Sequence, residues 1–408
     1  MLTTKALEVL VAKNLQQVRS PIRDLAAVAD QLQRQGKTVL MLNIGDPLDA
    51  DFSTPPELVE AVVQALRDGK NGYAPALGVG EALEAIRGEA ERKGIRNIQD
   101  VFITDGVSEA VDICLTALLN PGDDLLVPRP GYPLYTGVLA KIGAARNPYD
   151  LTEELEWEPD VEGLAARITP STRGIVLINP NNPTGAVHSR RTLESIVELA
   201  RQNNLVIFAD EIYDRVTFDG VEHVPLASLA PDVPVVTLGG LSKGFLATGW
   251  RVGWCVVSGP AGSVQSYIEG MHKLLRSRLS ANHPVQYAVR PALEGMQQHL
   301  PGMIAKLQAR RDLTLKWCDS NPRVRCVTPK GGFYAFPRLD IPEDDLDFVK
   351  ALLLEKQVLV VHGGGFGQQA GTRHIRIVFL PQESKLRNAY QAISQFMAER
   401  YGGRATSA

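Results

Sequence analysis

The stretch GGLSKGFLATGWRVGW, residues 239–254, is the most informative segment of this sequence. It places one lysine, Lys243, in a turn of small residues, and it places Arg251 eight positions later with a Gly-Trp pair on each side. A lysine in an arbitrary segment is usually a solvated surface charge, because lysine is rarely buried without a partner. These glycine-rich and apolar flanks make Lys243 the first candidate for a functional residue instead.

The composition is that of an ordinary globular protein. The 408 residues are 44% hydrophobic and 22% charged, which allows a large core in two domains, or in one domain with an additional lobe. The net charge is -3, from 43 basic and 46 acidic residues, and neither sign forms a long block. Nothing in this balance indicates binding to a nucleic acid or to an anionic membrane.

The cysteines and the apolar segments indicate a cytoplasmic protein. Neither a CxxC motif nor a Cys/His cluster is present, so we expect no disulfide scaffold and no metal site; the four cysteines are Cys114, Cys255, Cys318 and Cys326. The first residues, MLTTKALEVLVAKNL, lack the apolar core of a signal peptide. No apolar run approaches the ~20 residues that a membrane helix needs.

Short apolar runs alternate with helical patterns between about residues 104 and 257, which is typical of a parallel sheet covered by helices on both faces. The clearest strands are GIVLINP, NLVIFADE and VPVVTLGG, at residues 174–180, 204–211 and 233–240. The first two flank HSRRTLESIVELARQNN, whose apolar residues fit one helix face. This βαβ unit predicts an α/β domain with a right-handed crossover.

The C-terminal part has a different pattern. After about residue 290 we expect a long helix over 304–319, a turn at residues 331–332, a strand in FYAFP and a final amphipathic helix, which together form a smaller α+β domain. The tail after Gly402 has the composition of a frayed end. The predicted division is an N-terminal segment at 1–45 that packs with the small domain, a large domain at 46–290, and the small domain at 291–408.

Polar residues follow four of the predicted strands, where open α/β sheets bind their ligands. The loop TDGVS, residues 104–108, opens a helix whose first N–H groups can bind an anion. The other strand ends carry NPNNPTG at 179–185, then Asp210 and Tyr213, then Ser242 beside Lys243. Each of these alone is an ordinary cap, turn or core feature. Together they supply the phosphate site, the hydrogen-bond donors, the carboxylate and the amine that pyridoxal phosphate requires.

A set of segments also matches a known family in order and spacing: VLMLNIGDP, residues 73–78, TDGVSEA, RPGYPLY, TPSTRGIVLINPNNPTGAV, IFADEIYD, GLSKGFLATGWRVGW and RHIRIVFLP. Over nearly its whole length the sequence resembles the fold-type I, class I aminotransferases, and most of all their alanine aminotransferase branch. The resemblance implies a large domain with a mostly parallel central sheet, a smaller α+β domain, pyridoxal 5'-phosphate as the cofactor and a homodimer.

The resemblance implies a role for each matching cofactor residue. Lys243 matches the lysine that bonds covalently to the cofactor and then moves the proton, and Asp210 matches the partner of the pyridine nitrogen. Tyr213 and Asn182 match the donors to the ring oxygen. The remaining matches are Gly106, Val107, Ser108, Ser242 and Arg251 around the phosphate, Tyr132 stacked on the ring, and Tyr73, which reaches the phosphate across a dimer interface.

The substrate residues follow from the same resemblance. The family's groups that bind the substrate α-carboxylate match Arg376 and the backbone of Gly45, with Asn182 nearby. RHIRIV, residues 373–378, reads as a strand whose alternation puts His374 and Arg376 on one face. In QQVRSPI, Arg19 matches an arginine of the alanine-type pattern and is expected to contact the substrate.

The sequence departs from the family pattern at two positions. Gly240 stands where many members have a phosphate-binding serine, and Gln16 stands where an aromatic residue is expected near the substrate side chain. HGGGFG, residues 362–367, is not a nucleotide-binding loop, because it lacks the lysine and the hydroxyl of a P-loop. In the family this segment lies near the substrate entrance.

The resemblance implies ping-pong transamination between an L-amino acid and a 2-oxo acid, with alanine favoured as the amino acid and 2-oxoglutarate or pyruvate as the oxo acid. The residues leave open a transaminase for aspartate, valine or an aromatic amino acid, and a lyase that uses the same cofactor. A regulatory binding protein on this fold is disfavoured, because such proteins carry a fused DNA-binding segment and this sequence shows no basic helix-turn-helix.

Overall fold

The structure is a computed structural model that describes residues 9–18 and 21–402. Its centre is a seven-stranded sheet with the order β2-β8-β7-β6-β5-β3-β4. Neighbouring strands run parallel, except that β8 is antiparallel to both β2 and β7. The predicted α/β class is confirmed, with a mixed rather than a wholly parallel sheet. Its strands are β2 (Ile98–Thr104), β3 (Asp124–Arg129), β4 (Ala145–Asp150), β5 (Thr172–Ile178), β6 (Val206–Asp210), β7 (Val235–Gly240) and β8 (Gly253–Ser258).

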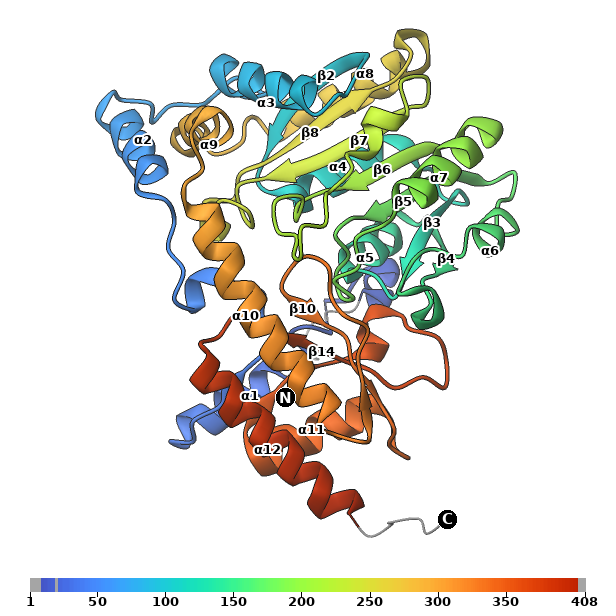
Figure 1. Cartoon of the computed structure of the whole chain (residues 1–408). Helices are drawn as coiled ribbons and strands as arrows, with labels where there is room; N and C mark the ends of the chain where they lie inside the picture. Colours follow the sequence, from blue (N-terminus) through green and yellow to red (C-terminus); the bar gives the residue numbers. More distant parts are fainter. Residues whose placement is uncertain (1–8, 19–20, 403–408) are drawn as a thin grey trace, which may run out of the picture.

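Helices cover both faces of the central sheet (Figure 1). In β5, Val176 and Ile178 join one apolar cluster while Ile175 and Leu177 join the other, which explains why this strand is apolar throughout. The first cluster includes α4 (Val107–Leu118), α5 (Pro133–Ile142) and α8 (Ala261–Ser277). The second includes α3 (Gly80–Arg92), α7 (Arg190–Asn203) and α9 (Val289–Glu294). The remaining helices of this part are α2 (Pro56–Arg67) and α6 (Val161–Ala165).

Local interactions determine where helix α7 begins and ends between two strands. Ser189 caps its first turn by accepting a hydrogen bond from the Thr192 N–H at 3.2 Å. The helix ends at Asn204, which has a left-handed φ of 52°. The strands and the helix predicted between residues 174 and 240 are therefore confirmed as β5, α7, β6 and β7.

The chain after α9 builds a second core with the segment before residue 46. Figure 1 shows α10 running from the central sheet down into this part, where α11 and α12 pack. The predicted long helix, turn, strand and final helix are all present, and the long helix begins earlier than expected, at His299. The helices are α1 (Ala26–Arg34), α10 (His299–Asp319), α11 (Asp345–Lys356) and α12 (Glu383–Tyr401). The strands are β1 (Leu40–Met41), β9 (Val324–Arg325), β10 (Tyr334–Ala335), β11 (Arg338–Leu339), β12 (Val358–Leu359), β13 (Val361–His362) and β14 (Ile375–Val378).

The N-terminal segment contacts both halves of the molecule. Ala29 and Leu32 of α1 join the C-terminal core, and β1 pairs in parallel with β12. The short helix η1 instead lies on α5, where the Asn14 side chain donates to the Lys141 carbonyl at 2.5 Å. The other short 3₁₀ helices are η2 (Pro47–Asp49), η3 (Glu153–Leu155), η4 (Leu226–Leu229), η5 (Thr248–Trp250), η6 (Pro284–Ala288) and η7 (Gly363–Phe366), and η1 is Lys13–Gln17.

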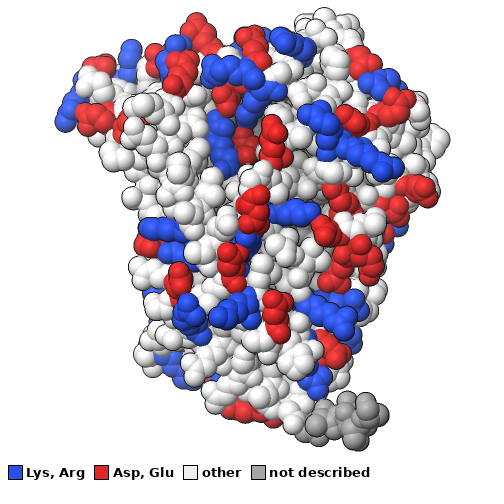
Figure 2. Space-filling model, in the orientation of Figure 1, with Lys and Arg blue, Asp and Glu red and all other residues white. Residues whose placement is uncertain are grey.

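The surface carries both signs of charge side by side. On the face shown in Figure 2, lysine and arginine side chains are interspersed with aspartate and glutamate, and neither sign gathers into a single patch. Within residues 9–18 and 21–402, none of the helices combines the length and the apolar character that crossing a membrane requires.

Because β8 runs antiparallel to β2 and β7, residues 239–254 lie at the end of the sheet where both of those strands terminate. Gly253, the first residue of β8, pairs with Gly240 at the end of β7 and with Thr104 at the end of β2. Residues 241–252 therefore lie beside the start of α4. A Cβ on Gly253 would lie 2.4 Å from the Gly106 carbonyl carbon and 2.5 Å from the Val107 nitrogen, so only glycine allows this approach.

We expect Gly253→Ala to lower the thermal stability, because the added methyl group must push β8 away from α4. Overpacking of this kind costs about 1–3 kcal/mol. Calorimetric melting of the two proteins without ligand measures the change. Gly262→Ala is the matched control, since a Cβ there meets open space near the start of α8. A Gly253→Ala protein with the same melting temperature as the wild type would contradict the close packing.

Candidate active site

A cavity of about 800 Å³ opens beyond the carboxyl ends of the central strands. Segments that are far apart in the sequence line it, from the loop before η2 to strand β14. The predicted site residues that line it are Gly45, Val107, Ser108, Tyr132, Asn182, Asp210, Tyr213, Ser242, Lys243, Arg251 and Arg376. Gly106 lies directly under the Arg251 guanidinium. Tyr73 is 80% exposed and lies apart from the cavity, and Arg19 falls outside the described residues.

Lys243 reaches the middle of the cavity from the turn after β7. Its Nζ donates to the Gly45 carbonyl oxygen at 2.7 Å and lies 5.4 Å from the centre of the Phe333 ring. Burial, together with the positive charges of Arg376 and Arg251, lowers the pKa of Lys243 to about 8, although Asp46 acts in the opposite direction. Neutral amine is therefore accessible near neutral pH, which makes Lys243 suited to nucleophilic attack and to proton transfer.

Asp210 and Glu211 point in opposite directions at the end of β6. Asp210 lines the cavity, and its Oδ2 accepts a hydrogen bond from the Tyr135 hydroxyl at 2.9 Å. Glu211 accepts from the Leu226 N–H at 2.9 Å on the other side of the strand. Burial raises the pKa of Asp210 to about 6, and no described cation forms an ion pair with it. A buried carboxylate without a cationic partner fits a protonated ring nitrogen in the cavity.

The start of α4 forms an anion site with Arg251. Gly106 precedes the helix with a φ of 84° and offers no side chain to cap it, so the first N–H groups stay open toward the cavity beside Val107 and Ser108. A Cβ on Gly106 would lie 2.2 Å from Arg251 Nη2, so the guanidinium lies directly on this turn. The Arg251 side chain is held there by the Thr248 carbonyl at 3.0 Å. Helix N–H groups and a guanidinium at one place fit a phosphate group.

Gly240 leaves no space for the serine that many family members have at its position. A Cβ there would lie 2.7 Å from the Val252 carbonyl oxygen, because β7 and β8 approach closely at this point. Ser242, which is buried and lines the cavity, is the hydroxyl that this turn provides instead.

Arg376 is buried at the opposite end of the cavity. It belongs to β14, the middle strand of the sheet β10-β14-β13, and is 1% exposed. Its Nη1 donates to Asn182 Oδ1 at 3.0 Å, and the rings of Tyr334 and Phe366 lie 4.5 and 4.8 Å from its guanidinium carbon. Within the described residues its Nε has no hydrogen-bond partner and no carboxylate pairs with it. Such a cation fits the α-carboxylate of a small substrate.

Two tyrosines of the site were not predicted from the sequence. Tyr334 hydrogen-bonds Tyr213 between hydroxyl oxygens at 2.8 Å and lines the cavity. Tyr135 contacts Asp210 and follows Tyr132 by three positions on α5. Tyr135 lies in the RPGYPLY motif, in the first turn of the helix that follows the site residue Tyr132, and this nearness to a predicted site residue is a signal that could have found it. Nothing local marks Tyr334, which lies in the strand-like FYAFP.

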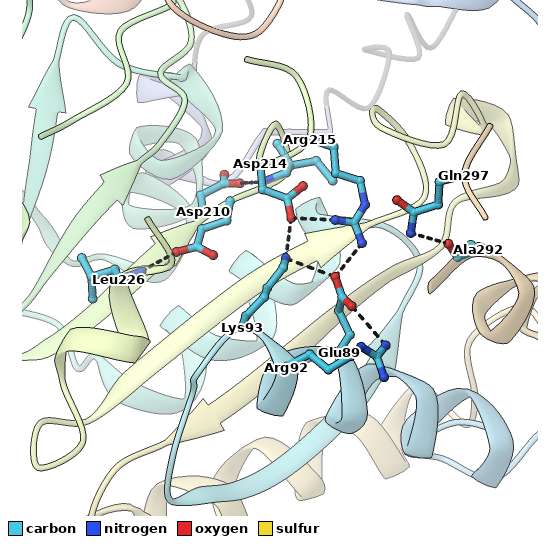
Figure 3. A network of polar contacts seen from close by, with 11 residues as sticks. Glu89, Arg92, Lys93, Asp210, Asp214, Arg215, Leu226, Ala292 and Gln297 are labelled. Carbon is cyan, nitrogen blue, oxygen red and sulfur yellow. Dashed lines mark hydrogen bonds and ion pairs between the residues drawn. The ribbon is translucent and has the colours of Figure 1, made fainter. Parts of the chain in front are cut away.

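An ion-pair network links the segment after β6 to helix α3 (Figure 3). Lys93 pairs with Asp214 at 2.5 Å, and Arg215 pairs with Glu89 at 2.7 Å. The Arg215 side chain also packs on the turn after Lys243, where its guanidinium carbon lies 4.9 Å from the centre of the Phe245 ring. Although burial alone would raise the pKa of Asp214, the charges of Lys93 and Arg215 lower it to about 2. The network thus ties α3 to the segments that carry both Tyr213 and Lys243.

Comparisons with known proteins show what this chain is similar to. The family model for aminotransferase class I and II matches residues 37–393. The glutamate-pyruvate aminotransferase AlaA of Haemophilus influenzae is 40% identical over 392 residues, which cover 94% of this chain and 95% of that protein. An alanine aminotransferase of Mycobacterium tuberculosis is 39% identical and covers 94% of this chain and 90% of its own length. The solved alanine aminotransferase of Pyrococcus furiosus superposes with a TM-score of 0.93 at 39% identity, over 96% of this chain and 100% of that chain.

We expect Lys93→Met to destabilise the protein, because it leaves the buried Asp214 carboxylate with Arg215 alone. Breaking a fully buried pair costs about 3–5 kcal/mol, and the partial exposure of Lys93 reduces the expected cost to about 2 kcal/mol. Urea unfolding measures the loss, with the exposed Lys385→Met as the matched control.

The pH dependence of this loss has a defined sign. A carboxyl group with a lowered pKa contributes stability above its unfolded pKa of about 3.9, and loses it as the pH falls toward the folded value. The difference between wild type and Lys93→Met should therefore be largest above about pH 5 and shrink on acidification. A difference that stays constant down to the acid transition would contradict the assigned pairing.

Proposed function

Because the chain belongs to the class I and II aminotransferases, we propose that it moves the amino group between alanine and 2-oxoglutarate, giving pyruvate and glutamate, in both directions. The observation that carries the proposal is the placement, in one cavity, of the Lys243 amine, the Asp210 carboxylate and the Arg376 guanidinium. Alanine is favoured because relatives named for alanine or glutamate-pyruvate transfer align over more than nine tenths of the chain.

The cavity suits pyridoxal phosphate, the cofactor of this family. The start of α4 and Arg251 would hold its phosphate, Asp210 would hold its ring nitrogen, and Tyr213 with Asn182 would donate to its ring oxygen. When bound, the cofactor supplies an aldehyde that bonds to amines and a protonated ring that withdraws electrons from the substrate Cα. Tyr132 lines the same cavity and would stack on the ring.

Lys243 carries out the proton transfers of the proposed reaction. Its Nζ, neutral for part of the population at pH 7–8 because the pKa lies at about 8, accepts the proton from the substrate Cα. The same atom returns a proton to the corresponding carbon of the 2-oxo acid in the reverse half-reaction. Gly45 orients the amine through its carbonyl oxygen, and its missing Cβ allows the Tyr334 hydroxyl to lie close by. One lysine can therefore serve both half-reactions.

Arg376 orients both substrates, because every amino acid and every 2-oxo acid has the same carboxylate beside the reacting carbon. Asn182 fixes one arm of the guanidinium, and two aromatic rings keep its faces dry. The cavity lining also includes the apolar side chains of Leu15, Val18 and Ile22, which supports a small apolar substrate such as alanine. Arg19, which lies outside the described residues, is proposed to contact the substrate.

The proposed enzyme is a cytoplasmic homodimer. Tyr73 is 80% exposed in the single chain, and Leu66 of α2 and Met296 are further exposed apolar side chains. Exposure of this kind supports an interface in which Tyr73 reaches the phosphate of a second copy. The reduced cysteines support a cytoplasmic location.

A panel of amino donors tests the proposal. Alanine, aspartate, valine and tyrosine are each assayed with 2-oxoglutarate, and glutamate, aspartate, valine and tyrosine with pyruvate, and kcat/KM is compared, with Lys243→Ala as the blank. We expect alanine with 2-oxoglutarate, and glutamate with pyruvate, to give the highest values. A higher value for aspartate, valine or tyrosine would contradict alanine as the substrate. Product formation that continues beyond one equivalent per active site without any oxo acid acceptor would indicate a lyase.

We expect Arg376→Lys to raise KM sharply for the amino acid and for the oxo acid alike, because lysine keeps the charge but loses the two parallel hydrogen bonds. The expected loss in kcat/KM is about 1.5–3 kcal/mol. The cofactor spectrum should not change. Arg373→Lys is the matched control, because Arg373 donates to the Glu343 and Pro342 carbonyls outside the cavity. A loss confined to one of the two substrates would show that the carboxylate is held elsewhere.

A further inference from the structure

Tyr135 contacts Asp210, and none of the roles that the family resemblance implies belongs to this tyrosine. It lies on α5, is 1% exposed, and donates its hydroxyl to Asp210 Oδ2 at 2.9 Å. The second donor to this carboxylate is the Ile212 N–H, at a longer distance of 3.4 Å to Oδ1. Tyr135 therefore provides the short hydrogen bond of this carboxylate.

The other groups around Asp210 do little to keep it charged. Tyr135 faces it from α5 and Tyr132 from the residue before that helix, and Glu211 is the next residue in the chain. The cations Lys243, Arg251 and Arg376 line the same cavity, yet none of them pairs with Asp210 in the described part of the chain. Burial raises the pKa of Asp210 and Glu211 raises it further, whereas the Tyr135 and Ile212 hydrogen bonds lower it.

We propose that Tyr135 is a positioning residue that keeps Asp210 ionised and fixes the orientation of its carboxylate, so that Asp210 can hold a protonated ring nitrogen. The ring nitrogen rests on the proposed function, whereas the hydrogen bond itself does not. Burial and the adjacent Asp210 hold the pKa of the Tyr135 hydroxyl far above its usual range, so the phenol remains a donor at every working pH. A phenol is a suitable partner because, unlike lysine or arginine, it stabilises the carboxylate without neutralising it.

The test titrates the Asp210 carboxyl group in the full chain freed of cofactor, by its protonated C=O band in infrared difference spectra. Asp210→Asn identifies the band by removing it. In Tyr135→Phe we expect the midpoint to move upward by about 1–2 pH units, the equivalent of one hydrogen bond to a charged group. The band would then be partly protonated at neutral pH.

Tyr149→Phe is the matched control. Tyr149 is also fully buried, and its hydroxyl donates to the Val176 carbonyl at 2.7 Å in the cluster on the other face of the sheet. Its loss removes one buried hydrogen bond without touching Asp210, so the midpoint should stay at the wild-type value. An unmoved midpoint in Tyr135→Phe, or an equal shift in Tyr149→Phe, would overturn the inference.

The dissociation constant of pyridoxal phosphate gives a second readout. We expect Tyr135→Phe to bind at least about tenfold more weakly than wild type at pH 7, and to approach wild-type affinity at a pH above the raised midpoint, where Asp210 is ionised again. Weakening that is equal at every pH would show a purely structural role and overturn the proposal. A wild-type chain that binds no pyridoxal phosphate would overturn the proposed function, which separates that failure from an unmoved midpoint in a chain that binds it.

Incorporation of 3-fluorotyrosine at position 135 keeps the experiment decisive if the phenylalanine variant does not fold. The fluorinated phenol is more acidic and of nearly the same shape, so it donates a stronger hydrogen bond and should move the Asp210 midpoint downward. A midpoint that is unchanged or moves upward would overturn the inference.

Discussion

The cavity contains buried charges that have no ionic partner among residues 9–18 and 21–402, and the surrounding structure has to stabilise them. Removing a charge from water is costly unless it is paired or hydrogen-bonded. Asp210 is stabilised by the Tyr135 hydroxyl and Arg376 by the Asn182 amide oxygen and two aromatic rings, all of them neutral groups. Neutral partners stabilise the charges without cancelling them, which leaves the charges available to a cofactor and to a substrate.

Directly behind this cavity, charged groups are paired instead. Lys93, Asp214, Arg215 and Glu89 neutralise one another between α3 and the segment after β6 (Figure 3). Asp210 and Asp214 lie four positions apart, and their pKa values move in opposite directions, upward to about 6 for the first and downward to about 2 for the second. Asp210 is therefore available to a ligand, whereas Asp214 anchors the chain. The direction of the pKa shift is a physical criterion that distinguishes two such carboxylates without any family resemblance.

Much of the architecture could be predicted, because strands and helices follow from patterns over a few residues. The apolar run in β5, the helical pattern of α7 and the TDGVS loop before α4 depend on local sequence and appear in the structure as expected. The direction of β8 was not accessible in this way, since its sequence shows only an apolar run. Tyr334 was missed for the same reason: its position beside Tyr213 depends on a contact between residues 121 positions apart.

The sequence by itself determined the fold class, the order of the elements and the candidate residues at the strand ends, because periodicity, capping and turn chemistry are short-range properties. Only the tertiary structure decided which charges stay unpaired and which neutral groups surround them. Arg376 is held in part by the Asn43 carbonyl, 333 residues earlier in the chain, and Asp210 by a tyrosine 75 residues before it. The pKa of a buried group depends on all of its neighbours in space, and those neighbours are fixed only when the chain has folded.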